Sequence, residues 1–469
     1  MLKRMRSFLV LVMLFITVTM SAQVTTATMS GKVTAQDEPI IGATIVAVHE
    51  PSGTRYGTVT NVSGQFNLQG MRTGGLYKVE ISYVGYQTAI YKGINLLLGE
   101  NYVLNVSLKE SSELLDEVVV TASKESNMKS DRAGAIMNAN RDMINSTPTI
   151  SRSISDIMRL SPQGADVGNG FAVGGGNYRQ SFVTVDGAAF NNTFGLGGNL
   201  PANGSPISLD ALEQVTVAVT PFDVRQSGFT GGAINAVTRS GDNQFRGTVY
   251  GYFNNENLRG DRVEDYKLTR SKSQYYTYGA SFGGPIIKDK LFFFVNGEYE
   301  DNVTAGSSYQ PRTSLDQEYT GNVRRPVENT IVDGNETWVG LNDMRQYLKE
   351  KYNYDPGRYN NYSVNTPAYR IMAPLDWNAN LNNKLSLRFT KTHTKDSNFP
   401  SSSTSPLSAD DIYPGDTGLG IPKGKDSGRS TKYSMSFENS NYYQVRDFTS
   451  VAGEWNSRFA NGAMNNMLR

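Results

Sequence analysis

The sequence predicts a mainly β protein, and three observations carry this prediction. Charged residues make up only 19% of the 469 residues, whereas glycine (46) and tyrosine (26) are abundant, which is typical of β-structure rather than of disorder. Apolar and polar residues alternate with a period of two in short runs such as 77–83. After residue 245 the alternating segments lengthen to about ten residues, enough for a tilted strand to cross a bilayer.

The composition also limits the chemistry. The chain has no cysteine and only two histidines, His49 and His393, far apart in sequence. This excludes disulfides, cysteine-ligated metals and thiol nucleophiles, and it disfavours a serine triad or a histidine-rich metal site. Lysine plus arginine (45) balance aspartate plus glutamate (44), so no basic stripe for nucleic acid is expected. We therefore expect no catalytic residues, no cofactor and no bound metal.

Residues 1–22 have the pattern of a secretory signal peptide. Three basic residues precede an apolar run at 8–19, and the small residues at 21–22 offer a cleavage site. The alternative is a membrane anchor, but the run is short for the ~20 residues that a helical span needs. We expect an exported protein that is periplasmic, secreted or inserted in an outer membrane.

Residues 24–109 predict a small β-sandwich of about seven strands. The runs 77–83 and 102–108 alternate with period two, and glycine-containing turns at 61–64 and 72–75 separate the strands. The alternation places one set of apolar residues on a single face of each strand: Tyr77, Val79, Ile81 and Tyr83 in the first run, and Tyr102, Leu104, Val106 and Leu108 in the second.

Four motifs occur in order within this domain: Gly31-Lys32-Val33-Thr34, then 39–45, then Thr60-Asn61-Val62-Ser63-Gly64-Gln65-Phe66, then 81–86. Together they resemble the carboxypeptidase regulatory-like domain. The resemblance covers nearly the whole segment and implies a non-catalytic sandwich placed before a transporter.

A linker at 110–129 contains the run Asp116, Glu117, Val118, Val119, Val120 and Thr121. Its β-branched residues favour an extended conformation, and two interpretations stay open. The run is one more strand of a neighbouring domain, or it is a TonB box, which it resembles in composition and position. A TonB box would imply TonB, with ExbB and ExbD, as periplasmic partners, bound by strand addition.

Residues 130–240 predict a mixed α and β unit. The stretch 153–160 forms one apolar helical face, with Leu160 a weak member, and Pro162 ends it. Strands are predicted at 182–187 and 212–219. The glycine-rich stretch 168–176 lacks the lysine and hydroxyl residue of a phosphate loop, so we expect it to be a packed loop.

This unit closes with 228–239, which has a Gly-Gly, Ile-Asn, Thr-Arg pattern. The order of segments resembles the plug domain of TonB-dependent outer-membrane receptors, and 221–225 looks like the Oar-like branch. The resemblance assigns a plug motif to Asp186, Gly187, Gly228, Gly231, Gly232, Ile234, Asn235 and Thr238. We expect close packing or positive φ at the paired glycines, inward packing of Ile234 and Val237, and hydrogen bonds from Asn235 and Thr238.

Residues 245–469 then predict part of a transmembrane β-barrel, with polar stretches at 302–366 and 396–431 as extracellular loops. The expected strands are 246–254, 275–284, 291–300, 368–379, 384–393, 433–443 and 445–458, with a short turn at 284–290 that resembles the Oar-like pattern. A plugged transporter barrel needs ~22 strands. We therefore expect an incomplete barrel and the N-terminal part of a longer protein.

The fold class expected is an N-terminal β-sandwich, an α+β plug and the first strands of an incomplete transmembrane β-barrel. The resemblance implies a TonB-dependent active transporter of the Oar-like or SusC-like branch of Bacteroidetes type. It would lie in the outer membrane of a Gram-negative bacterium, with the sandwich and TonB box periplasmic. It would take up a glycan, peptide or chelate, with a surface lipoprotein as a further candidate partner. The alternative is an Oar-like protein for protein export or adhesion without nutrient import.

Overall fold

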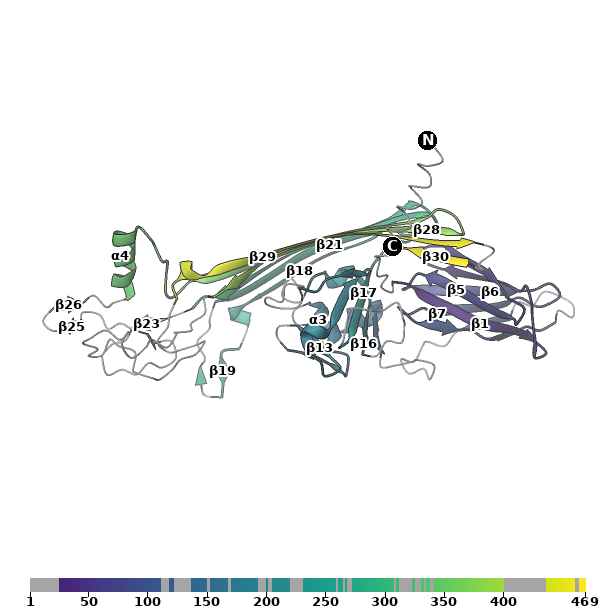
Figure 1. The fold of residues 1–469 in the computed structure, drawn as a ribbon, viewed down its shortest axis with the longest axis horizontal. Helices are drawn as coiled ribbons and strands as arrows, with labels where there is room; N and C mark the ends of the chain where they lie inside the picture. Colours follow the sequence, from purple (N-terminus) through teal and green to yellow (C-terminus); the bar gives the residue numbers. More distant parts are fainter. Residues whose placement is uncertain are drawn as a thin grey trace, which may run out of the picture.

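The computed structural model describes 25–110, 118–121, 136–149, 152–167, 170–192, 200, 205–219, 231–258, 260–264, 266–267, 272–307, 309–311, 323–324, 330–332, 335–337, 341–399, 436–459 and 464–469. The expected signal peptide, Asp116, Glu117, Gly228 and the run 221–225 lie outside these residues. Within them the chain is mainly β, in three bodies that Figure 1 shows as a sandwich, a central unit and a long curved sheet above both.

The N-terminal body is a sandwich of two five-stranded sheets. One sheet consists of β1 (Ala27–Ala35), β2 (Glu38–Pro39), β5 (Gln65–Met71), β8 (Asn101–Val103) and β9 (Val106–Ser107). The other has the order β10-β7-β6-β3-β4, with β3 (Thr44–His49), β4 (Thr54–Val59), β6 (Leu76–Ser82), β7 (Ala89–Asn95) and β10 (Val118–Thr121).

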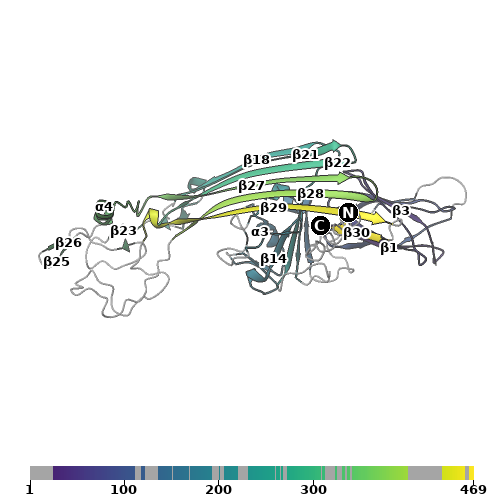
Figure 2. The ribbon, with the colours of Figure 1, turned by 45° about the horizontal axis from the view of Figure 1, so that its top comes forward.

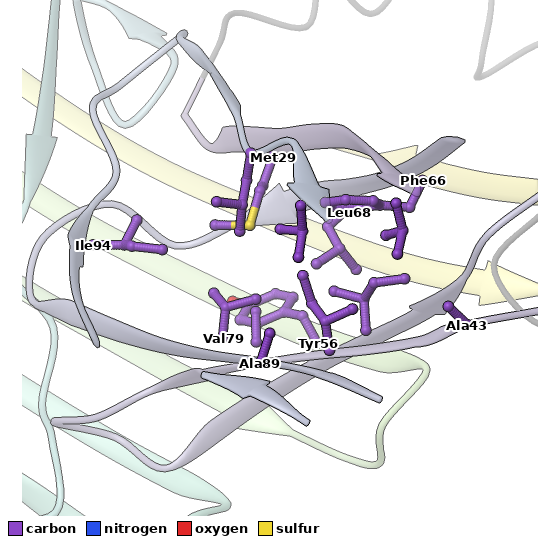
Figure 3. Close-up of a cluster of buried hydrophobic side chains, with 14 of the residues drawn as sticks. Met29, Ala43, Tyr56, Phe66, Leu68, Val79, Ala89 and Ile94 are labelled. Carbon is purple, nitrogen blue, oxygen red and sulfur yellow. The ribbon is translucent and has the colours of Figure 1, made fainter. Parts of the chain in front are cut away.

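The sandwich core is formed by the alternating residues that the sequence predicts. Figure 3 shows Met29 and Leu68 of one sheet facing Val79 and Tyr56 of the other. Tyr77, Val79, Ile81, Leu104, Val106 and Leu108 are buried, and Tyr102 packs against the cluster. Tyr83, predicted on the same face as Tyr77, is not part of this core. Strand β6 ends at Ser82, and Tyr83 is 37% exposed with its ring against that of Tyr86.

The central body, here called the plug unit, has one mixed sheet of order β11-β16-β17-β14-β15. Its strands are β11 (Ile136–Asn140), β14 (Phe182–Val185), β15 (Ala188–Ala189), β16 (Leu212–Ala218) and β17 (Ala233–Thr238), with the separate pair β12 (Gly164–Asp166) and β13 (Phe171–Val173). Its helices are α2 (Arg141–Ser146), α3 (Ile154–Met158) and the 3-10 turns η2 (Tyr178–Gln180) and η4 (Leu209–Ala211).

Helix α3 begins with a capping box between Ser153 and Asp156, and it buries Ile154, Ile157 and Met158 as predicted. The helix ends before Leu160, which is 36% exposed. The weak prediction that Leu160 belongs to the apolar helical face is therefore wrong. The glycine-rich stretch is also more regular than expected, since β13 occupies part of it and pairs with β12.

The third body, here called the wall, is a seven-stranded antiparallel sheet in sequence order. Its strands are β18 (Arg246–Asn255), β21 (Ser273–Ile287), β22 (Leu291–Ala305), β27 (Ser363–Asn378), β28 (Asn383–Asn398), β29 (Tyr442–Phe459) and β30 (Met464–Leu468). In the described part of the chain its two edges, β18 and β30, do not pair with each other, so the barrel is not closed. Figure 2 shows the wall running past the plug unit to the sandwich.

Shorter elements lie in the connections between wall strands: η5 (Glu256–Leu258), β19 (Arg262–Val263), β20 (Tyr266–Lys267), β23 (Gln310–Pro311), β24 (Val323–Arg324), β25 (Thr330–Val332), β26 (Asn335–Thr337), α4 (Leu341–Tyr352) and η6 (Glu438–Ser440). Helix α4 lies at the end of the wall remote from the sandwich (Figure 1).

Three features of the wall differ from the prediction. The described part of 433–443 is not a strand until β29 begins at Tyr442, because Glu438 pairs with Arg358 at 2.9 Å and turns the chain into η6. Strand β30 was not predicted, since its adjacent asparagines interrupt the apolar alternation. The turn before β22 is also shorter than expected, because β21 continues to Ile287.

The two faces of the wall differ as the alternation predicts. Phe292 and Phe294 of β22 are buried, together with Asn296, Glu298 and Glu300, whereas Val295 and Tyr299 are exposed. The outward side also carries the exposed side chains Tyr278, Phe282, Leu387, Val451, Trp377 and Trp455. The inward side faces the plug unit.

Candidate functional site

The contact between wall and plug unit is centred on Arg370 of β27, which is 2% exposed. Its Nη1 lies 2.9 Å from Glu298 Oε1 and its Nη2 lies 2.8 Å from Glu300 Oε2, both on the neighbouring β22. Its Nε donates to the carbonyl oxygen of Ser205 in the plug unit at 2.5 Å. A wall arginine paired with two wall glutamates therefore holds the plug backbone.

The other oxygen of Glu298 extends this contact. It accepts from the hydroxyl of Ser208 at 2.8 Å and from the hydroxyl of Tyr250 on β18 at 2.5 Å. Thr392 of β28 donates to the carbonyl of Pro206 at 2.9 Å. Side chains from four wall strands thus converge on the plug segment 205–208, and we call this set the wall latch.

A second charged contact follows directly in sequence. Asp210 lies 3.1 Å from Arg141 and 3.6 Å from Arg239, and Thr248 of β18 donates to it at 2.8 Å. Burial alone would raise the pKa of Asp210. Hydrogen bonds from Ser281 and Thr248 and the two guanidinium groups outweigh it, so the pKa is lowered and the carboxylate stays ionised.

Three residues of the predicted plug motif, Asp186, Gly187 and Thr238, lie at the turn after β14. Asp186 and Gly187 have φ of 49° and 79°, so the turn uses the left-handed region. Asp186 accepts from the backbone N of Thr238 at 3.0 Å and from its hydroxyl at 2.6 Å. Burial raises the pKa of Asp186 above its usual value. Thr184 donates to Asn235 at 2.7 Å, which joins β14 to β17 by side chains as well as backbone.

The paired glycines pack closely against the plug unit. A Cβ added to Gly232 would lie 2.5 Å from Val173 Cγ1 and 3.1 Å from the carbonyl of Ala218. At Gly231 it would meet Gln180 at 3.3 Å. Neither glycine has positive φ, so close approach is the constraint. Ile234 is fully buried, whereas Val237 is only half-buried.

The TonB-box-like run is placed by its backbone. Val118–Thr121 forms β10, which pairs in parallel with β7 of the sandwich, from Val118 opposite Ala89 to Thr121 opposite Lys92. In the structure this part of the run is therefore a strand of a neighbouring domain. This is one of the two interpretations that the sequence leaves open. Such a strand remains compatible with a TonB box, because strand addition needs the same extended backbone.

Contacts of the sandwich with the other two bodies were not foreseen from the sequence. Arg72 donates to the carbonyl of Gly241 at 3.2 Å, and the backbone N of Asn243 donates to the carbonyl of Pro51 at 3.0 Å. Arg458 of β29 donates to the carbonyls of Gly57 and Gln69 at 2.9 and 2.8 Å. These donors join residues hundreds of positions apart, so local periodicity carries no signal for them.

His49 ends a hydrogen-bonded chain that starts on the wall. Asn378 donates to the hydroxyl of Thr54 at 2.8 Å, and that hydroxyl lies 2.6 Å from Ser52 Oγ. Ser52 Oγ lies 2.6 Å from His49 Nδ1, and His49 Nε2 lies 2.7 Å from the carbonyl of Gly74. A carbonyl only accepts, so Nε2 carries the proton. Burial, aided by Arg72, lowers the pKa of His49 to about 3, which keeps it neutral.

Both histidines of the chain have hydrogen-bond partners in the structure. His49 is used within the sandwich, and His393 pairs with Asp447 on the wall at 2.7 Å. No group of three or more histidine and carboxylate side chains suited to a metal ion occurs among the residues described. Across the same residues, no helix is both long and apolar enough to span a membrane. The three bodies are held together by polar contacts and, between plug unit and wall, also by apolar packing of Phe294, Met372 and Phe448.

Comparisons with known proteins agree with this architecture. Residues 28–109 match the carboxypeptidase regulatory-like domain and residues 237–431 match an outer membrane beta barrel domain. The TonB-dependent transporter Oar of Myxococcus xanthus is 25% identical over 61% of this chain and 26% of its own. The TonB-dependent receptor SusC of Bacteroides thetaiotaomicron is 29% identical over 44% of this chain and 20% of its own.

Among solved structures, the siderophore receptor PirA from Acinetobacter baumannii aligns with a TM-score of 0.40 and 15% identity, over 70% of this chain and 38% of that chain. The chain spans about a quarter of the length of Oar and a fifth of that of SusC. Of these two curated relatives, one is named a transporter and the other a receptor, and neither is named an enzyme. The two domain matches and these relatives support a TonB-dependent receptor of the Oar and SusC type.

Proposed function

We propose that this chain contributes the sandwich, plug and first wall strands of a TonB-dependent active transporter in the outer membrane. The observation that carries the proposal is the wall latch, where Arg370 of the inner wall face binds the plug backbone at Ser205. A unit held by buried ionic contacts against the inner face of a barrel wall blocks the passage through it. Transport then requires an input of work to move that unit.

The outer face of the wall supports the location. Apolar and aromatic side chains alternate outward along strands of 15 to 18 residues in β21, β22 and β29, as a bilayer requires. Trp377 and Trp455 lie near the ends of their strands closest to the sandwich, and Tyr278 and Tyr299 lie further along. Such aromatic positions suit the two interfaces of a membrane. The sandwich end is then periplasmic and the α4 end extracellular.

The force that moves the plug unit would be applied to the run from Asp116 to Thr121. TonB, energised with ExbB and ExbD by the inner-membrane proton-motive force, would take this segment by strand addition and pull on the plug unit behind it. Strand β11 is the next described strand after the run, so a pull on the released run would pass along the chain to the plug sheet. The cargo we propose is a large nutrient ligand, a glycan, peptide or chelate, with a surface lipoprotein as a candidate partner.

A single substitution tests the coupling. Val119→Pro removes a backbone donor and prevents strand addition. We expect the full-length variant to lose binding to the periplasmic domain of TonB, at unchanged surface abundance. Val119→Thr, which keeps the donor and the β-branched shape, should bind as the wild type does. Retained binding by the proline variant would contradict the assignment of this run as the TonB contact.

A further inference from the structure

Strand β10 occupies what would otherwise be an open edge of the sandwich. Four residue pairs hold it to β7, against five or six between the other neighbours of that sheet. Without β10, β7 would present a row of unpaired backbone groups, which is a template for another strand. The edge therefore accepts a short extended peptide through its backbone, in the same way as a strand-adding partner would.

The segment that follows β7 is hydrogen-bonded to the plug unit. Three residues after β7, the backbone N of Leu98 donates to the side-chain oxygen of Gln214 on β16 at 3.2 Å. Gln214 is 2% exposed, and its Nε2 lies 3.5 Å from the side-chain oxygen of Asn138 on β11. Strand β11 is the next described strand after β10. One buried amide thus connects the edge that holds β10 with the plug strand that follows it.

This arrangement has a mechanical consequence. A force applied to β10 while it is paired with β7 is borne by the sandwich sheet, and only a released β10 transmits that force along the chain to β11. The four-pair ladder is the shortest one in its sheet, so a longer competing strand can replace it. Coupling therefore requires that β10 leave the sandwich first.

We propose that the β7 edge of the sandwich and TonB compete for Val118–Thr121, which we call the coupling segment. The sandwich binds this segment until TonB displaces it. This inference rests on the proposed function, because it takes TonB as the partner of the run. The apparent affinity for TonB then falls in proportion to the fraction of chains with β10 docked. The rival arrangement, in which TonB adds to the outer edge of a docked β10, predicts no competition.

The absence of cysteine from the sequence allows a clean test. Thr121 lies opposite Lys92 in the ladder, and neighbouring strands are ~4.8 Å apart, within disulfide range. The double variant Lys92→Cys with Thr121→Cys in the full-length chain should form a disulfide on oxidation. The two single variants are the controls. Binding to the periplasmic domain of TonB is then measured for the oxidised and the reduced double variant.

We expect the oxidised form to lose TonB binding and reduction to restore it to the level of the single variants. A free peptide of residues 112–125 should bind TonB more tightly than the wild-type chain. Equal binding of oxidised and reduced forms overturns the competition while leaving the TonB contact intact. Failure of the disulfide to form overturns the docked state. If neither the reduced form nor the peptide binds TonB, the proposed function itself fails, and the competition with it.

Discussion

The plug unit has two neighbours, and it is held to them in different ways. Toward the wall it meets the buried ions of the latch, where Arg370 is paired with both Glu298 and Glu300. Toward the sandwich it meets single hydrogen bonds, from Asn138 to the carboxylate of Glu100 and from the backbone of Leu98 to the amide of Gln214. Removing one partner of a buried ionic set costs far more than breaking a single hydrogen bond. The wall contact therefore fixes the plug unit, whereas the contact with the sandwich opens at a lower cost.

The largest effect is expected at the latch. Arg370→Met leaves Glu298 and Glu300 buried without a counter-ion, and should lower the free energy of unfolding by about 3–5 kcal/mol. Urea unfolding of the full-length protein in detergent measures this loss. Adding Glu298→Gln and Glu300→Gln removes the stranded charges and should recover most of the stability. If the single variant is as stable as the wild type, the latch does not hold the plug.

The second largest effect is expected from a packing defect within the plug unit. Gly232→Val places side-chain atoms where Val173 and the carbonyl of Ala218 already lie, at a cost of ~1–3 kcal/mol. We expect the plug to shift and the pore to admit large antibiotics that the wild type excludes, at equal surface abundance. Gly453→Ala, where a Cβ meets nothing within 4 Å, is the matched control. Unchanged antibiotic sensitivity would show that this segment does not keep the plug in place.

The stability of the sandwich should depend on pH. The pKa of His49 is depressed from its ordinary 6.5 to about 3, so its contribution is complete above pH 6.5 and declines as the pH falls toward 3. Each pH unit in that window removes up to ~1.4 kcal/mol, or roughly 2 kcal/mol by pH 5. Denaturant unfolding of the sandwich signal between pH 7 and pH 5 should show this slope. His49→Gln should flatten it, and an equal slope in that variant would contradict the assignment.

The smallest effect is expected where the wall touches the sandwich. Asn378→Ala removes the donor to Thr54 and should cost about 0.5–1.5 kcal/mol. Proteolysis between the sandwich and plug should become faster while the wall stays intact. Asn398→Ala, on the wall but remote from the sandwich, should leave that rate unchanged. A larger loss than that of Arg370→Met would reverse the ranking of the two contacts.

Local alternation predicted much of this fold. The buried run Phe292, Phe294, Asn296, Glu298 and Glu300 was assigned to the inward face because successive strand residues alternate between faces. It could not reveal that Arg370 lies opposite Glu298, because that pairing depends on a register set across a long connection. Sequence periodicity likewise missed β30, since Asn465 and Asn466 interrupt it, and it left β10 undecided between two roles.

Hydrogen exchange tests the central contrast most directly, because it reports the opening of each strand in the intact chain. The backbone amides of β17, which is enclosed between β16 and β14, should exchange only with large-scale opening of the plug unit. Those of β10 should exchange orders of magnitude faster, since a four-pair edge ladder opens locally. Equal protection of β10 and β17 would contradict the account, because the coupling segment would then be held as firmly as the plug itself.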